Sequence, residues 1–117
     1  MFKRTPQLFL QDILDSGESI RSYVQGFTFE QFERERMRYS AVIREFEIIG
    51  EAVGKLPGRM KDRFPDVAWQ DIKDFRNLLT HEYFGVDLQI VWNTIQSDLP
   101  QLLAAVRTMI EVQPCRT

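Results

Sequence analysis

The sequence lacks long apolar runs, a secretion signal and cysteine pairs. Its longest apolar runs, Ile48-Ile49 and Leu102 to Val106, are far shorter than the roughly 20 residues needed to cross a bilayer. The N-terminus has a basic start, but no apolar stretch of roughly 7–15 residues follows it. The one cysteine, Cys115, can neither close an internal disulfide nor join a multi-cysteine metal site. We therefore expect a cytoplasmic protein that does not associate with membranes.

The chain also lacks an excess of positive charge. Its 15 basic and 17 acidic residues leave a formal net charge of −2. Proteins that bind DNA tightly through its phosphates usually have an overall basic footprint, so we do not expect DNA as a partner. Two local basic stretches are present: Arg34, Arg36, Arg38 and Arg44, then Lys55, Arg59, Lys61 and Arg63. Because acidic residues interrupt both, each is either a track for RNA or a solvated helix face.

The length and composition of the chain are ordinary for a folded globular domain. A chain of 117 residues is long enough for one compact domain and too short for two of usual size. Apolar residues make up 44% and charged residues 27%, unlike the composition of disordered proteins. No internal repeat, low-complexity tract or Gly/Ser linker divides the sequence. We expect a single domain over residues 1–117.

Apolar residues recur at helical spacing along most of the chain. The pattern predicts four long helices and one short one, over residues 6–24, 28–55, 59–63, 68–84 and 87–110. Alternation of apolar and polar residues, as in a strand, never extends beyond a few positions. Pro100 should kink or interrupt the last helix, because proline lacks an amide hydrogen. We therefore predict an all-α fold, an antiparallel helical bundle.

Several helix ends are marked by capping residues. Thr28 and Gln31 have the spacing of a capping box at the start of the second helix. Asp66 and Asp87 are expected to cap the fourth and last helices. Gly85 is placed to end the fourth helix in a left-handed conformation.

The candidate catalytic residues lie on the predicted fourth helix. At about 100° per residue, Arg76 and Tyr83 lie within about 40° of Ile72, at the margin of the apolar stripe. His81 projects to the opposite side, where a regular helix turns it away from its own core. A symmetric homodimer is the simplest way to cover that side. Pairing the helix with its own copy would bring two histidines and two arginines into one cleft.

His81 is the only histidine in the chain. Imidazole titrates near neutral pH and can act as general base or acid, and an arginine fork can hold a phosphate. Cleavage of RNA by its own 2′-hydroxyl needs little more, so no metal and no cofactor are expected.

Structural alternatives stay open for each of these residues. For His81 the alternative is an ordinary surface histidine, and for Tyr83 it is an aromatic at the margin of the core. For Arg76 it is one half of a helix salt bridge to Asp74 or Glu82. Asn77, four residues before His81, either orients the imidazole or is simply exposed.

The order Arg76, four residues, His81, one residue, Tyr83 resembles the R-x-x-x-x-H-x-Y signature of HepT-like toxins in the HEPN ribonuclease superfamily. The similarity covers about residues 8–110. Three further stretches resemble that family: Ile48 to Ala52, Phe64 to Trp69, and Arg76 to Asp87. A signature of this length is weak alone, and specific when its flanking residues and helical context also match.

The resemblance implies an all-helical, homodimeric toxin that cuts RNA without metal, with its site where the two motif helices meet. Arg76 and His81 are carried over as catalytic, whereas Asn77 is a supporting candidate because of its spacing from His81, not because of the resemblance. The resemblance also implies a partner, a minimal nucleotidyltransferase antitoxin that transfers AMP from ATP to Tyr83 and so silences the toxin. Phosphate and bulk would then lie beside the arginine meant for the substrate.

Two other functions are compatible with the sequence. One is a non-catalytic HEPN subunit that binds nucleotide or positions substrate for its nucleotidyltransferase partner, and the other is a helical adaptor between proteins. The paired presence of Arg76 and His81 favours the ribonuclease, because a pure binding module has no need of a titratable group there.

Overall fold

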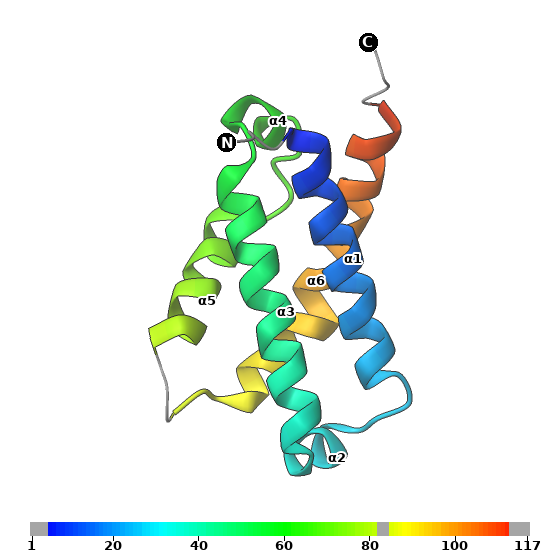
Figure 1. The fold of residues 1–117 in the computed structure, drawn as a ribbon, viewed down its shortest axis with the longest axis vertical. Coiled ribbons are helices and arrows are strands. Elements are labelled where there is room, and N and C mark those ends of the chain that lie inside the picture. Colours follow the sequence, from blue (N-terminus) through cyan, green and yellow to red (C-terminus); the bar gives the residue numbers. More distant parts are fainter. Residues whose placement is uncertain (1–4, 82–84, 113–117) are drawn as a thin grey trace.

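A computed structural model describes residues 5–81 and 85–112 of the chain. Within these ranges every regular element is a helix (Figure 1). In chain order these are α1 (Pro6–Val24), α2 (Phe29–Arg34), α3 (Arg36–Lys55), α4 (Gly58–Asp62), α5 (Trp69–His81) and α6 (Leu88–Val112). The predicted all-α class is confirmed.

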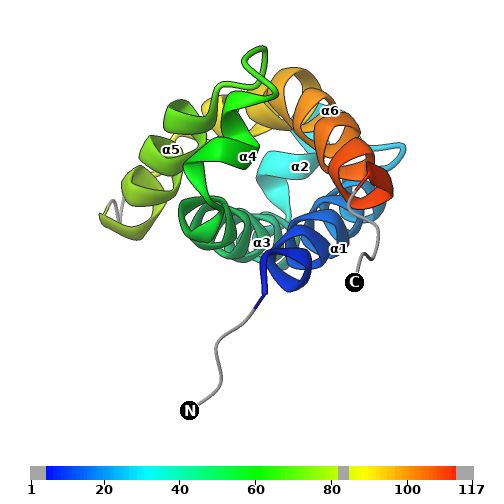
Figure 2. The same ribbon diagram turned by 90° about the horizontal axis from the view of Figure 1, so that it is seen from above.

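The four long helices α1, α3, α5 and α6 run antiparallel to their neighbours, and the short helices α2 and α4 lie at opposite ends (Figure 1). Seen from above, α3 lies between α1 and α5, and α6 lies on the other side of α1 (Figure 2). Helix α1 packs extensively on both α3 and α6, whereas α5 packs mainly on α3. The helix that carries the motif is therefore held chiefly from one side.

The core fills the space enclosed by these helices. Its largest fully buried side chains are Phe32, Leu10, Ile13, Ile20, Ile49, Leu99, Leu103, Val42, Val53, Val91 and Val106. The ring of Phe32 meets Trp92 at 5.3 Å and Tyr39 at 6.3 Å between centroids, so α2 is tied to both α3 and α6. No helix in the described ranges is long and apolar enough to span a membrane.

Several predicted boundaries are confirmed. The first helix occupies residues 6–24, and the capping box at Thr28 and Gln31 is present. The amide of Gln31 donates to Thr28 Oγ1 at 3.2 Å, and the amide of Thr28 donates to Gln31 Oε1 at 2.9 Å. Asp87 caps α6, since its Oδ1 accepts from the amide of Gln89 at 2.9 Å.

The single helix predicted for residues 28–55 was wrong. Glu35 adopts an extended conformation, with φ −110° and ψ 91°, and separates α2 from α3. At about 100° per residue, a continuous helix would place Phe32 about 80° away from Val42. The break turns α2 so that Phe32 enters the same core as Val42.

The predicted cap at Asp66 and the predicted interruption at Pro100 also need correction. Helix α5 begins at Trp69, and the amide of Ile72 bonds to the carbonyl of Ala68, so Asp66 is not at the cap. Helix α6 continues across Pro100, so the proline does not interrupt it, and the kink stays a prediction. The carbonyl that loses its partner belongs to Gln96, which is exposed and can bond to water, while Leu99 and Leu103 on either side of the proline are buried.

Candidate functional site

The start of α5 is fixed by the indole of Trp69. Its Nε1 donates to the carbonyls of Lys61 at 3.1 Å and Phe64 at 3.0 Å. These carbonyls lie at the end of α4 and in the loop that follows, where a helix leaves acceptors unsatisfied. Further along, the ring of Phe75 packs edge-on against Phe46 of α3 at 5.1 Å. These contacts set the position and rotation of α5 relative to α3.

Arg76 crosses α3 at Gly50. A Cβ atom added to Gly50 would lie 2.2 Å from Cβ and 2.5 Å from Cγ of Arg76. Any larger residue would therefore collide with the stem of the arginine. The two helices approach this closely only because position 50 has no side chain.

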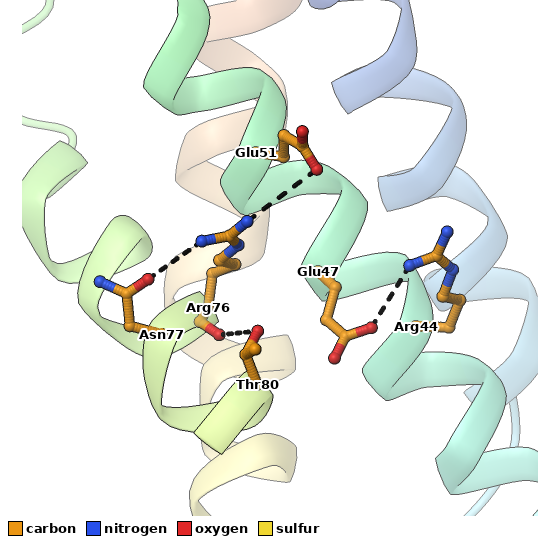
Figure 3. A network of polar contacts seen from close by, with 6 residues as sticks. All are labelled: Arg44, Glu47, Glu51, Arg76, Asn77 and Thr80. Carbon is orange, nitrogen blue, oxygen red and sulfur yellow. Dashed lines mark hydrogen bonds and ion pairs between the residues drawn. The ribbon is translucent and has the colours of Figure 1, made fainter. Parts of the chain in front are cut away.

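Figure 3 shows the guanidinium of Arg76 between Asn77 of its own helix and Glu51 of α3. Its Nη1 donates to Asn77 Oδ1 at 3.1 Å, and its Nη2 lies 4.0 Å from Glu51 Oε1. The side chain is 37% exposed. Arg76 is thus oriented by two neighbours and remains accessible to a ligand.

The ion pair of Arg76 differs from the alternative weighed from the sequence. Glu51 lies on α3, so the pair joins two helices. Asp74 accepts instead from Gln70 Nε2 at 3.0 Å, and Glu82 lies outside the described residues.

Asn77 and Thr80 lie near Arg76 on α5 (Figure 3). Asn77 is exposed, and its oxygen accepts from Arg76. Thr80 Oγ1 donates to the carbonyl of Arg76 at 2.9 Å. Leu78, beside them, is 41% exposed. A single chain therefore leaves this side of α5 open over Asn77 and Leu78.

The remaining motif residues are only partly covered. His81 is the last helical residue described in α5, so its backbone continues the helix from Arg76. Its side chain, and the whole of Tyr83, lie outside the described residues. The roles predicted for His81 and Tyr83 stay predictions, as does that of Gly85 at the helix end. Cys115 also lies outside the described ranges.

A groove of about 310 Å³ runs between α3 and α5 beside Arg76. It is lined by Gly50, Glu51, Gly54, Lys55, Lys73, Arg76 and Asn77. Sequence reasoning missed the contribution of Lys73 and the glycines to this groove. The available signals were the G-x-x-x-G spacing of residues 50–54 and the placement of Lys73 three residues before Arg76.

Three of the eight cations in the two basic stretches are bonded within the fold. Arg38 bonds to Glu35 at 2.9 Å, and Arg44 pairs with Glu47 at 3.4 Å. Lys61 Nζ donates to the carbonyl of Val53 at 3.2 Å. Among residues 5–81 and 85–112, no three His, Cys, Asp or Glu side chains are grouped so as to hold a metal ion.

Comparisons with known proteins agree with the motif. The family model described as "Ribonuclease HepT-like" matches residues 13–109. A probable ribonuclease HepT of Thermococcus cleftensis is 37% identical over 100 residues, covering 86% of this chain and 91% of that protein. A candidate RNase of Caldanaerobacter subterraneus subsp. tengcongensis is 37% identical over 108 residues, covering 92% and 96%. No solved structure gives a significant match. The chain belongs to the ribonuclease HepT-like family.

Proposed function

We propose that this protein is a metal-independent endoribonuclease and the toxin of a toxin–antitoxin pair. The observation that carries the proposal is the position of Arg76 in a family member whose relatives are named as ribonucleases. Its guanidinium is oriented by Asn77 and Glu51 yet remains partly exposed. A planar guanidinium held in this way is suited to bind a phosphodiester through two parallel hydrogen bonds.

The proposed reaction uses the RNA's own nucleophile. His81 removes the proton of a 2′-hydroxyl, and the oxygen forms a bond to the adjacent phosphorus. Arg76 stabilises the negative charge that develops on the phosphoryl oxygens. The bond from phosphorus to the 5′-oxygen breaks, and the leaving oxygen takes a proton from an imidazolium.

A homodimer would place two copies of this machinery in one cleft. The support is the open side of α5, where Leu78 and Asn77 are exposed in the single chain. In a two-fold dimer the same patch meets itself, so each α5 would cover the other. One histidine could then act as base and the second as acid. Light scattering at micromolar concentration tests this directly, with a dimer expected and a monomer contradicting it.

The proposed antitoxin is a minimal nucleotidyltransferase that transfers AMP to Tyr83. The phenolic oxygen attacks the α-phosphorus of ATP, pyrophosphate leaves, and the phenolic proton passes to solvent or a base. With the partner and ATP, we expect mass spectrometry to show a gain of one or more AMP units on the wild type. Tyr83→Phe should gain none, and modification that persists in this variant would exclude Tyr83 as the target.

The central test is cleavage by the purified protein. Single-stranded RNA is incubated with wild type, His81→Ala and Arg21→Ala in the presence of a metal chelator, and products are resolved by size. Wild type and Arg21→Ala should cut, because Arg21 lies on α1, away from α5. His81→Ala should lose at least about a hundredfold in rate. Equal activity of wild type and His81→Ala, with matching thermal unfolding, would refute the proposed mechanism. A wild type that binds RNA without cutting it would favour the non-catalytic binding subunit.

A further inference from the structure

The groove between α3 and α5 has an unusual charge for this protein. Three cations, Lys55, Lys73 and Arg76, line it with one acid, Glu51, which gives a local charge of +2. The whole chain has a net charge of −2. The cleft on the opposite side of α5, about 190 Å³ in volume, is lined by Asp71 and Asp98 and by no cation of the described part of the chain. Positive charge is thus concentrated on the side of α5 that faces Glu51.

The glycines of α3 form the floor of this groove. Gly50 and Gly54 are one helical turn apart, so they lie on the same face of α3. Arg76 crosses Gly50, and a Cβ atom added to Gly54 would lie 3.8 Å from Lys73 Cε. Arg76 and Lys73 are likewise one turn apart on α5. Each long cation therefore lies over one glycine, in register.

The two lysines differ from most cations in the neighbouring elements. Within residues 5–81 and 85–112, neither Lys55 nor Lys73 forms a hydrogen bond or an ion pair through its side chain. Arg44 and Lys61, by contrast, are bound to Glu47 and to the carbonyl of Val53. The ammonium groups of Lys55 and Lys73 are available for a ligand.

We propose that this groove, lined by Lys55, Lys73 and the two glycines, binds a backbone phosphate of the RNA strand next to the one held by Arg76. The inference rests on the proposed ribonuclease function and adds Lys55 and Lys73 as positioning residues. Lysine is a compact, mobile point charge suited to phosphate contacts that carry no sequence information. The glycine floor lets the strand lie close to the backbone of α3. The strand then enters along α3 and reaches the exposed guanidinium of Arg76.

The test measures binding separately from cleavage. The probe is a fluorescent 2′-O-methyl oligonucleotide, which has no free 2′-hydroxyl and cannot be cut by the proposed reaction. Its affinity is measured from about 50 to 200 mM salt, because each phosphate of a single strand that the protein neutralises adds about 0.7 to the slope of log K against log salt. Because both lysines are proposed to hold the same phosphate, Lys73→Ala and Lys55→Ala should each bind roughly 3- to 10-fold more weakly and show a slope smaller by up to about 0.7.

Two variants serve as controls. Lys73→Arg keeps the charge and should retain the slope. Arg21→Ala removes one positive charge from α1, on the other side of α3 from α5 (Figure 2), and should leave both affinity and slope unchanged. An unchanged slope in Lys73→Ala, or an equally reduced slope in Arg21→Ala, would overturn the proposal that the groove binds a phosphate.

The same measurements separate the groove from the proposed function. If wild type cuts no RNA while Lys73→Ala binds the uncleavable probe more weakly and with a smaller slope, the ribonuclease proposal fails and the groove stands. If wild type cuts RNA while both lysine variants keep the wild-type slope, the groove fails and the ribonuclease stands. A wild type that does not bind the probe at all also overturns the groove.

Discussion

The stem of Arg76 lies directly over the backbone of Gly50, so close that a Cβ atom on Gly50 would be 2.2 Å from Cβ of the arginine. A residue on α3 therefore determines where a candidate functional side chain of α5 is held. The guanidinium then reaches Glu51 and Asn77. The placement of the candidate catalytic arginine depends on a glycine that has no chemistry of its own.

Replacing each of the two glycines of α3 by alanine should change the free energy of unfolding in opposite directions. Gly50→Ala forces α5 outward and should cost roughly 1–3 kcal/mol of unfolding free energy, as overpacking does, and cleavage should fall with it. Gly54→Ala meets only an ordinary contact at 3.8 Å and should stabilise the helix by up to about 1 kcal/mol. Urea denaturation measures both. Similar stabilities for the two variants would show that the helices are not in close contact at Gly50.

Arg76 should be needed for its charge and its fork. Arg76→Met keeps an unbranched stem over Gly50 and should lose roughly a hundredfold or more in cleavage rate, with little change in thermal stability, since exposed ion pairs contribute about 0–1 kcal/mol. The cleavage rate of Arg76→Lys should lie between those of wild type and Arg76→Met, because an ammonium group keeps the charge but cannot hold phosphate in a planar fork. Single-turnover cleavage provides the measurement. Full activity in Arg76→Met would remove Arg76 from the catalytic site.

Glu51 should weaken RNA binding while it helps to orient Arg76. It is 63% exposed and lies 4.0 Å from the guanidinium, so an incoming phosphate must compete with it. Glu51→Gln should raise affinity for the 2′-O-methyl probe by up to about fivefold, the equivalent of a surface pair worth at most about 1 kcal/mol. Glu47→Gln is the matched control, because Glu47 lies one turn earlier and pairs with Arg44. Equal effects of the two substitutions would indicate a general change in charge.

Tyr23 and Glu45 should give the protein an alkaline transition. The hydroxyl of Tyr23 donates to Glu45 Oε2 at 3.1 Å, and this bond, with the negative charge of Glu45, raises the pKa of Tyr23 above its ordinary value of 10.0. The folded state thus favours the neutral phenol. This contribution to stability is complete below the ordinary pKa and disappears as the pH rises through the raised one.

Absorbance titration of tyrosinate can follow that transition. Glu45→Gln should move the pKa of Tyr23 back toward its ordinary value, and Tyr23→Phe should remove the shifted component altogether. Tyr39→Phe should leave the shifted component in place. A titration that does not change in Glu45→Gln would contradict the assignment to this pair.

Local signals in the sequence predicted much of the fold. The boundaries of α1, the capping box at Thr28 and Gln31 and the cap at Asp87 depend on residues within a few positions of each other, so local chemistry is sufficient. The break at Glu35 was missed because residues 33–36 alternate Glu and Arg, which are good helix formers. Its cause is tertiary, the entry of Phe32 into the core.

In the candidate site, too, local features could be predicted from the sequence and contacts between helices could not. The spacing of Arg76, His81 and Tyr83 is visible in the sequence, and the continuation of α5 from Arg76 to His81 follows from it. The ion pair weighed as an alternative for Arg76 was with an acid of its own helix, whereas its partner in the structure, Glu51, lies on α3. Which acid pairs with the arginine depends on how α3 and α5 cross. The crossing point is Gly50, and a glycine has no side chain from which such a contact could be predicted.

The one-sided attachment of α5 separates stability from activity. Helices α1, α3 and α6 share the most deeply buried contacts, while α5 leans mainly on α3. Substitutions that tilt α5 can therefore abolish activity and still leave the protein folded and able to bind the same partners. In the proposed ribonuclease, loss of activity can therefore arise without loss of the folded protein.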